Sequence, residues 1–136
     1  MIPSLDVDTE MVRVPQAGDT WPVEWLGERA GLLEGSALPG QGMSVVSAHN
    51  TLNTTEYGPF ALLFTLKVND TVMVRDENGS LKLFRVYANA LLEADDTETL
   101  TSIAARGTNT LVLVTCENES AEGGYLNRRV VFAAQK

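Results

Sequence analysis

The chain has one cysteine and one histidine among its 136 residues. A single cysteine excludes an internal disulfide, and it excludes a zinc site built from several thiolates. Basic residues are also scarce, since ten lysines and arginines stand against eighteen aspartates and glutamates. The resulting net charge of −8 argues against nucleic-acid binding, because phosphate backbones are held by lysine and arginine. An acidic surface also matches anionic lipid headgroups poorly.

Long apolar runs are missing as well. No stretch approaches the roughly 18 apolar residues that indicate a membrane span. The first ten residues, MIPSLDVDTE, lack the basic and apolar parts of a signal peptide. We therefore expect any membrane anchor to lie outside residues 1–136. The length suits one hydrophobic core, and residues 1–136 are expected to form a single domain.

Strand-like patterns dominate what the sequence does contain. Alternating or β-branched apolar runs predict strands at residues 2–14, 43–50, 70–91, 109–116 and 127–134. Within residues 70–91, the Asn78–Gly79 pair predicts a hairpin. Short helical patterns occupy residues 25–35, 58–68 and 95–107. We expect a mostly β domain that forms a closed or nearly closed barrel with short helices in its connections.

The candidate catalytic residues lie at the ends of strand-like runs. His49 closes the run VVSAH, Cys116 closes LVLVTC, and Arg128 and Arg129 open the last run. In a compact β fold, such positions can converge at one rim of the sheet. A thiolate is a strong nucleophile toward a carbonyl, and an imidazole exchanges protons near neutral pH. An arginine can stabilise the oxyanion that develops. Together they predict a centre for cysteine-based acyl transfer.

Each of these residues also has a structural interpretation. A single cysteine is commonly an inert packed residue, a single histidine is commonly structural or exposed, and an arginine pair can discourage aggregation at a strand edge. The alternative hypothesis is thus a non-catalytic β-barrel binding module with Cys116 buried. Native alkylation separates the two, because a buried thiol resists modification until the domain unfolds.

The motifs resemble those of the sortase family, the cysteine transpeptidases of Gram-positive bacterial surfaces. Residues 112–116, VLVTC, match Thr-Leu-X-Thr-Cys except that Val112 replaces the first threonine. The run RRVVFAA resembles the family's arginine-led strand, and VVSAHNT resembles its histidine strand with Ala48 in place of a glycine. The opening IPSLDVD and the segments on either side of the histidine strand also resemble the family, so the likeness extends over nearly the whole chain.

The resemblance implies a closed eight-stranded β-barrel with short helices and an active site at one end of a groove. It implies that Cys116 is the nucleophile, His49 the general acid and base, and Arg128 the oxyanion or substrate clamp. Arg129 is the alternate, because a one-residue register slip exchanges the two faces of a strand. Thr115 and Ala48, which precede the cysteine and the histidine, are candidates for substrate binding.

The resemblance also implies partners and a location. The substrate would be the C-terminal sorting signal of a surface protein, commonly Leu-Pro-X-Thr-Gly, and the acceptor an amine on a cell-wall precursor or a pilin. The domain would be extracytoplasmic, face the cell wall and reach the membrane only through an anchor outside this chain.

No cofactor is expected. Some family members bind calcium, which requires several oxygen ligands. One candidate loop here offers only Glu34, so the acids Glu93, Asp95, Asp96 and Glu98 are more readily explained as a solvated run at a helix start. Pilin-polymerising members often carry a lid with an Asp-Pro-aromatic element. The segment GDTWPVEW has those residue types in another order, and we expect Trp21 and Trp25 to be packing residues.

Overall fold

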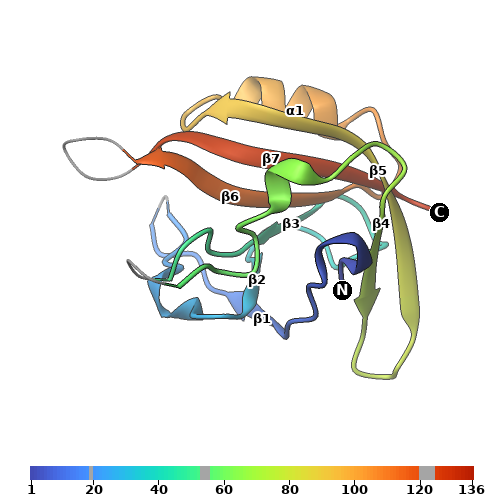
Figure 1. Cartoon of the computed structure of the whole chain (residues 1–136). Helices are drawn as coiled ribbons and strands as arrows, with labels where there is room; N and C mark the ends of the chain where they lie inside the picture. Colours follow the sequence, from blue (N-terminus) through green and yellow to red (C-terminus); the bar gives the residue numbers. More distant parts are fainter. Residues whose placement is uncertain (19, 53–55, 120–124) are drawn as a thin grey trace.

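The computed structural model describes residues 1–18, 20–52, 56–119 and 125–136 (Figure 1). Its strands are β1 (Met11–Val14), β2 (Ala30–Leu33), β3 (Ser44–Ser47), β4 (Thr71–Arg75), β5 (Leu81–Glu93), β6 (Leu111–Glu119) and β7 (Tyr125–Gln135). Helix α1 spans Thr97–Ala104, and short 3-10 turns occur at η1 (Pro3–Leu5), η2 (Glu24–Leu26) and η3 (Leu63–Thr65).

The strands form one seven-stranded sheet in the order β1-β2-β3-β6-β7-β5-β4. Figure 1 shows this sheet curled into a half-barrel. The pairs β1–β2 and β3–β6 are parallel, and the other neighbours are antiparallel. The central strand β6 therefore has a parallel neighbour on one side and an antiparallel neighbour on the other.

The prediction of a mainly β fold with few helices is confirmed, but the described residues form a seven-stranded half-barrel and not clearly a closed eight-stranded barrel. In the part of the chain that the structure describes, the outermost strands β1 and β4 do not pair with each other. A hollow of about 530 Å³ lies between them, with Met11–Arg13 on one side and Val74–Asn78 on the other. The edge of β4 instead pairs with the first residue, since the Met1 amino group donates to Met73 O (2.7 Å) and Met73 N donates to Met1 O (2.8 Å).

The sheet has a hydrophobic cluster on each face. The inner cluster fills the concave side, and its buried members include Val46, Phe84, Leu111, Leu113 and Val131. The outer cluster lies beneath α1, and its buried members are Leu92, Ala104, Val112, Val114, Val130 and Phe132. Because β6 contributes alternate residues to both clusters, every side chain from position 111 to position 115 is at most 8% exposed. This two-sided burial explains the continuous apolar run.

Helix α1 confirms the prediction of a helix within residues 95–107. The Asp96 carboxylate accepts a hydrogen bond from Thr99 N (3.1 Å), which is an N-cap contact. Leu100 and Ile103 pack against the outer cluster. The Tyr87 hydroxyl, which comes from β5, donates to Ile103 O (2.7 Å) near the end of the helix. Capping and packing thus fix α1 on the convex face of the sheet.

Other sequence predictions had mixed outcomes. The strands at β3, β6 and β7 are confirmed, and so is the β4–β5 hairpin, where Gly79 has a φ of +83°. The expected strand at residues 2–14 exists only as β1, because Asp6 adopts a left-handed φ of 54° after η1.

Two of the predicted helical segments differ from the structure. Residues 25–35 contain η2 followed by strand β2, since the apolar run AGLL pairs with both β1 and β3. Within residues 58–68 only η3 is helical, and Phe64 is 52% exposed there. In both segments tertiary contacts override the local helical pattern.

The outer cluster should contribute strongly to stability. Phe132 is fully buried beneath α1, with its ring centroid 6.2 Å from that of Tyr87. We expect Phe132→Ala to lower the free energy of unfolding by about 3–5 kcal/mol, since it leaves a cavity. Leu81→Ala on β5 is the control, because Leu81 is 46% exposed. Urea unfolding measures both, and an equal loss in the two variants would contradict the proposed packing.

Candidate active site

Cys116 and Arg128 are direct neighbours across the β6–β7 pair. The antiparallel register places Cys116 opposite Arg128 and Thr115 opposite Arg129. Side chains of directly opposed residues lie on the same face of a sheet. Cys116 therefore shares a face with Arg128, together with Val112 and Val114 of the outer cluster. The thiol is half-buried and Arg128 is exposed, so both can be reached from the convex side.

The parallel register between β3 and β6 brings His49 to the same place. The last residue pair of this ladder is Ser47 with Val114, and a hydrogen bond from Ala48 N to Val114 O (3.3 Å) continues it. His49 and Cys116 each come two residues after this last pair in their own segments. The side chain of Asn50 then donates to Cys116 O (3.1 Å), which ties the end of β3 to the end of β6. Arg128 thus lies opposite Cys116, and the residue after His49 contacts the Cys116 main chain.

Arg129 lies on the other face and has a different set of contacts. Its guanidinium donates to Asn89 Oδ1 (3.1 Å). The Asn89 amide in turn donates to the carbonyls of Leu63 (3.2 Å), Phe64 (3.3 Å) and Leu66 (2.9 Å), all at η3. Arg129 is therefore part of a hydrogen-bond network that holds η3 against the concave side of the sheet.

The thiol of Cys116 experiences two opposing electrostatic effects. Burial raises the pKa of Cys116 above its ordinary value, because a low-dielectric surrounding disfavours the thiolate. The positive charge of Arg128 lowers this pKa and partly offsets the effect of burial. The protonated thiol is therefore favoured near neutral pH, and a base must remove its proton before it can attack.

Thr115 and Ala48 lie away from the convex surface. Thr115 is 1% exposed and Ala48 is 4% exposed, and Ala48 belongs to the inner cluster. The Thr115 hydroxyl has no hydrogen-bond partner within the described residues. Their predicted contact with substrate stays a prediction.

Two further residues contact the candidate site without having been predicted to do so. The ring of His49 bonds through Nε2 to the backbone carbonyl of Val23 (2.9 Å), and Asn50 holds the Cys116 backbone. A polar residue directly after the histidine was a usable signal for Asn50. No sequence signal could identify Val23, because it acts through its main chain. Asp19, the acid of the lid-like segment GDTWPVEW, lies outside the described residues.

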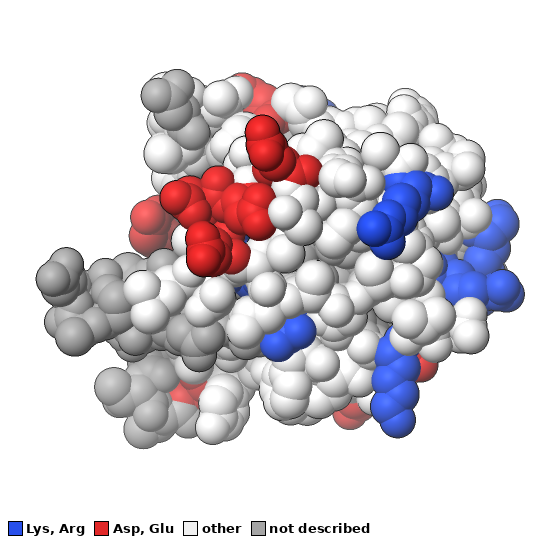
Figure 2. Space-filling model, turned by 90° about the horizontal axis from the view of Figure 1, so that it is seen from above, with Lys and Arg blue, Asp and Glu red and all other residues white. Residues whose placement is uncertain are grey.

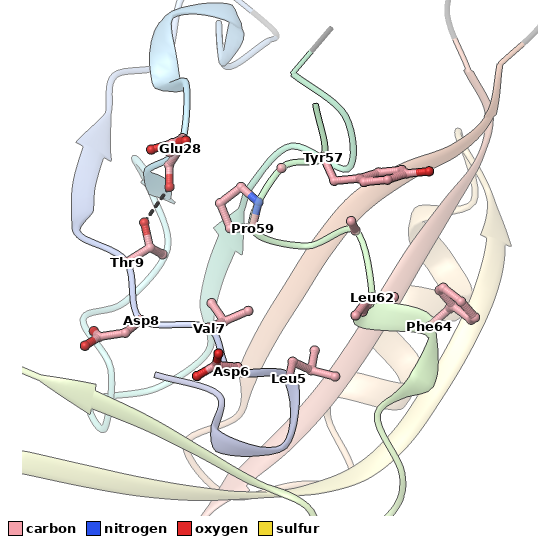
Figure 3. A pocket seen from close by; sticks show the side chains of 12 residues that line it. Leu5, Asp6, Val7, Asp8, Thr9, Glu28, Tyr57, Pro59, Leu62 and Phe64 are labelled. Atoms are coloured by element: carbon pink, nitrogen blue, oxygen red, sulfur yellow. Dashed lines mark hydrogen bonds between the residues drawn. The ribbon is translucent and has the colours of Figure 1, made fainter. Parts of the chain in front are cut away.

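A separate pocket of about 800 Å³ is lined in part by residues between positions 57 and 64, which follow His49 in the chain (Figure 3). Apolar side chains, Leu5, Val7, Pro59, Leu62 and Phe64 among them, line it together with Tyr57 and the acids Asp6, Asp8 and Glu28. Cys116, His49 and Arg128 do not line it. Its wall nevertheless supports the histidine, because Gly58 N donates to Asn50 O (2.8 Å) and Phe60 N donates to His49 O (3.1 Å).

The acids considered for calcium lie on the convex face. Figure 2 shows Asp and Glu gathered there, in the region where α1 begins. Glu93, Asp95 and Glu98 are exposed, while Asp96 caps the helix. Among the described residues, no three acids, histidines or cysteines lie close enough to hold a metal ion. The negative charge at the start of α1 is favourable for the helix dipole.

Comparison with known proteins identifies the family and the fold. The family model of the sortase domain matches residues 1–136. No curated protein sequence matches the chain. The fold is similar to sortase A from Corynebacterium diphtheriae (24% identity, TM-score 0.77, 99% of this chain and 58% of that chain). It is also similar to sortase C-1 from Actinomyces oris (22% identity, TM-score 0.76, 100% of this chain and 71% of that chain).

A third similar structure is sortase C from Streptococcus pneumoniae (24% identity, TM-score 0.76, 99% of this chain and 63% of that chain). The chain thus spans 58% to 71% of the length of these three relatives. At such identities the structures establish the shared fold. Because the family model matches the whole sequence, the chain belongs to the sortase family.

Proposed function

We propose that this chain is the catalytic domain of a cysteine transpeptidase. It would cleave a C-terminal sorting signal of the Leu-Pro-X-Thr-Gly type and transfer the protein to an amino group. The observation that supports the proposal is the position of Arg128 opposite Cys116, together with the contact of Asn50, the residue after His49, with the Cys116 carbonyl. Nucleophile, base and cation have to meet at one carbonyl for this reaction.

In the first half of the reaction, the Cys116 sulfur attacks the carbonyl carbon of the threonine in the sorting signal. The thiol proton passes to His49 as the carbon–sulfur bond forms. When the carbon–nitrogen bond breaks, His49 gives a proton to the leaving glycine amine. The products are a thioester on Cys116 and a free peptide amine, so protons and bonds balance. Burial raises the pKa of Cys116, which favours the participation of a base such as His49.

Arg128 is our choice for stabilising the oxyanion. It is opposite Cys116 on the same face, exposed and therefore able to meet a substrate. One such donor typically stabilises the transition state by about 3 kcal/mol. The bond of Arg129 to Asn89 supports a scaffold role for Arg129.

In the second half, an incoming amine loses a proton to His49 and attacks the thioester. A new amide bond forms, the carbon–sulfur bond breaks, and Cys116 recovers its proton. We propose that the acceptor is an amine on a cell-wall precursor or a pilin. Pilin substrate specificity is attributed to the similar sortase C from Streptococcus pneumoniae, and this motivates the pilin option.

The proposed location is outside the cytoplasm, with the domain facing the cell wall. No helix within the described residues is long and apolar enough to cross a membrane. We also propose that the reaction needs no cofactor or calcium.

The alternative function is a non-catalytic β-barrel binding module with a structural cysteine. That hypothesis requires a fully packed thiol. The half-buried state of Cys116 and its position opposite an exposed arginine favour the enzyme instead.

The first test uses intact mass spectrometry. Native protein is incubated with a Leu-Pro-X-Thr-Gly peptide and a glycine-based amine, with and without a calcium chelator. We expect a peptide–amine product in both conditions, and none with Cys116→Ala, because that variant lacks the nucleophile. A folded Cys116→Ala protein that still forms the product would contradict the proposal. A reaction that stops on chelation would contradict the absence of a calcium requirement.

The second test determines which of the two arginines acts on Cys116, by measuring how the rate of Cys116 alkylation depends on pH. Removing the Arg128 charge disfavours the thiolate. Arg128→Gln should therefore raise the pH at which the alkylation rate is half-maximal. Arg128→Lys keeps the charge and should leave the profile close to that of the native protein. Arg129→Gln is the matched control and should leave it unchanged. A larger shift with Arg129→Gln than with Arg128→Gln would assign the role to Arg129.

A further inference from the structure

The histidine ring is held by a backbone carbonyl. His49 Nε2 lies 2.9 Å from the Val23 carbonyl oxygen. A carbonyl oxygen can only accept a hydrogen bond, so Nε2 must carry the proton in this contact. The same bond persists when the ring becomes an imidazolium, because both nitrogens are then protonated. It follows that Nδ1 is the nitrogen that gains and loses a proton while the contact is kept.

The Val23 carbonyl is itself fixed in place. It also accepts a hydrogen bond from Leu26 N (3.1 Å) at η2. Leu26 is 1% exposed and packs closely over Gly31 of β2, where an added Cβ would lie 3.1 Å from Leu26 Cδ1. The absence of a side chain at Gly31 thus lets Leu26 anchor the turn directly on the sheet.

Two indole groups hold the remainder of the segment 21–29, which we call the tryptophan loop. Trp21 Nε1 donates to Glu34 O (2.8 Å), just beyond the end of β2. Trp25 Nε1 donates to Pro22 O (2.9 Å) within the loop. Arg29 lies over the Trp25 ring at 5.2 Å and donates to Trp25 O (3.0 Å). These contacts determine where the Val23 carbonyl points.

The backbone of His49 is constrained from the opposite side. Its carbonyl oxygen accepts a hydrogen bond from Phe60 N (3.1 Å). Gly58 approaches so closely that an added Cβ would lie within clashing distance of the His49 carbonyl oxygen. The main chain and the ring of His49 are thus held by two separate segments of the chain.

We propose that the tryptophan loop is a positioning element for the catalytic histidine. The Val23 carbonyl keeps Nε2 protonated, and Nδ1 exchanges protons with Cys116, the leaving amine and the incoming amine. The loop does for His49 what the third member of a catalytic triad does for its base. The catalytic part of this inference rests on the proposed function, whereas the hydrogen-bonded state of the ring does not.

The test uses ¹⁵N-labelled, untagged protein and NMR. His49 is the only histidine in the sequence, so its ring nitrogens give the only imidazole signals. We expect a sharp one-bond proton–nitrogen correlation from Nε2, protected from solvent exchange, at mildly acidic and at mildly alkaline pH. Only the Nδ1 shift should move strongly with pH. A protected proton on Nδ1, or no protected ring proton at all, would overturn the proposal in the native protein without using any variant.

A variant then tests the loop. Trp21→Phe removes the indole donor and keeps an aromatic ring, whereas Tyr57→Phe removes the polar group of a side chain that is 79% exposed on the segment following His49. We expect Trp21→Phe to lose the protected Nε2 proton and to lower kcat about tenfold, with the KM for the sorting peptide changed less than about twofold. Tyr57→Phe should change neither quantity.

The outcomes separate the two proposals. An unchanged Nε2 signal in folded Trp21→Phe would overturn the role of the loop, and so would a loss confined to KM. If the native protein shows the protected Nε2 proton but forms no product with any peptide, the proposed function fails and the placement of the histidine stands.

Discussion

Strand β6 is hydrogen-bonded to β3 on one side and to β7 on the other, and the candidate site depends on this double pairing. The parallel pairing with β3 leads the chain to His49 and to Asn50, which contacts the Cys116 carbonyl, and the antiparallel register with β7 places Arg128 opposite Cys116. A shift of one residue in the β6–β7 register would exchange Arg128 for Arg129. The positions of the reactive groups are therefore set by backbone hydrogen bonds between strands.

Burial on both faces keeps this register in place. The inner cluster and the outer cluster both include residues of β6, and burying a valine or leucine side chain typically stabilises a fold by about 1.5–3 kcal/mol. A slipped strand would bring residues of the wrong size into both clusters. Burial decreases at the end of the run, from 1% exposure at Thr115 to a half-buried Cys116. The candidate nucleophile thus lies at the first position of the run that is accessible and still paired with β7.

The parts of the structure predicted from sequence are those governed by local patterns. β-Branched runs and the Asn78–Gly79 turn indicated β6, β7 and the hairpin, and an acidic start with an apolar face indicated α1. The strand β2 was expected to be helical, because its AGLL run is too short to show a period and its pairing with two strands is a tertiary effect. The open edge between β1 and β4 depends likewise on how far the sheet curls, which no local pattern encodes.

The candidate site also has features that the sequence predicted and features that it did not. Cys116, His49 and the arginine pair were recognisable because each stands at the end of a strand-like run. The choice of face for Arg128 depends on register, and the contact between His49 and Val23 depends on a main-chain atom. Neither feature leaves a side-chain pattern. The tryptophans of the lid-like segment were expected to be packing residues, and their hydrogen bonds instead shape the loop that meets the histidine.

The central claim is that one face of the sheet, at the end of β6, binds the scissile carbonyl. A crystal structure of the protein with a sorting-signal mimic attached to Cys116 through a disulfide tests it most directly. The account predicts that the carbonyl oxygen of the mimic lies within hydrogen-bond distance of the Arg128 guanidinium, with the His49 ring on the same face and still bonded to Val23 O. A peptide that meets Arg129, or that lies on the concave face away from His49, would contradict the account.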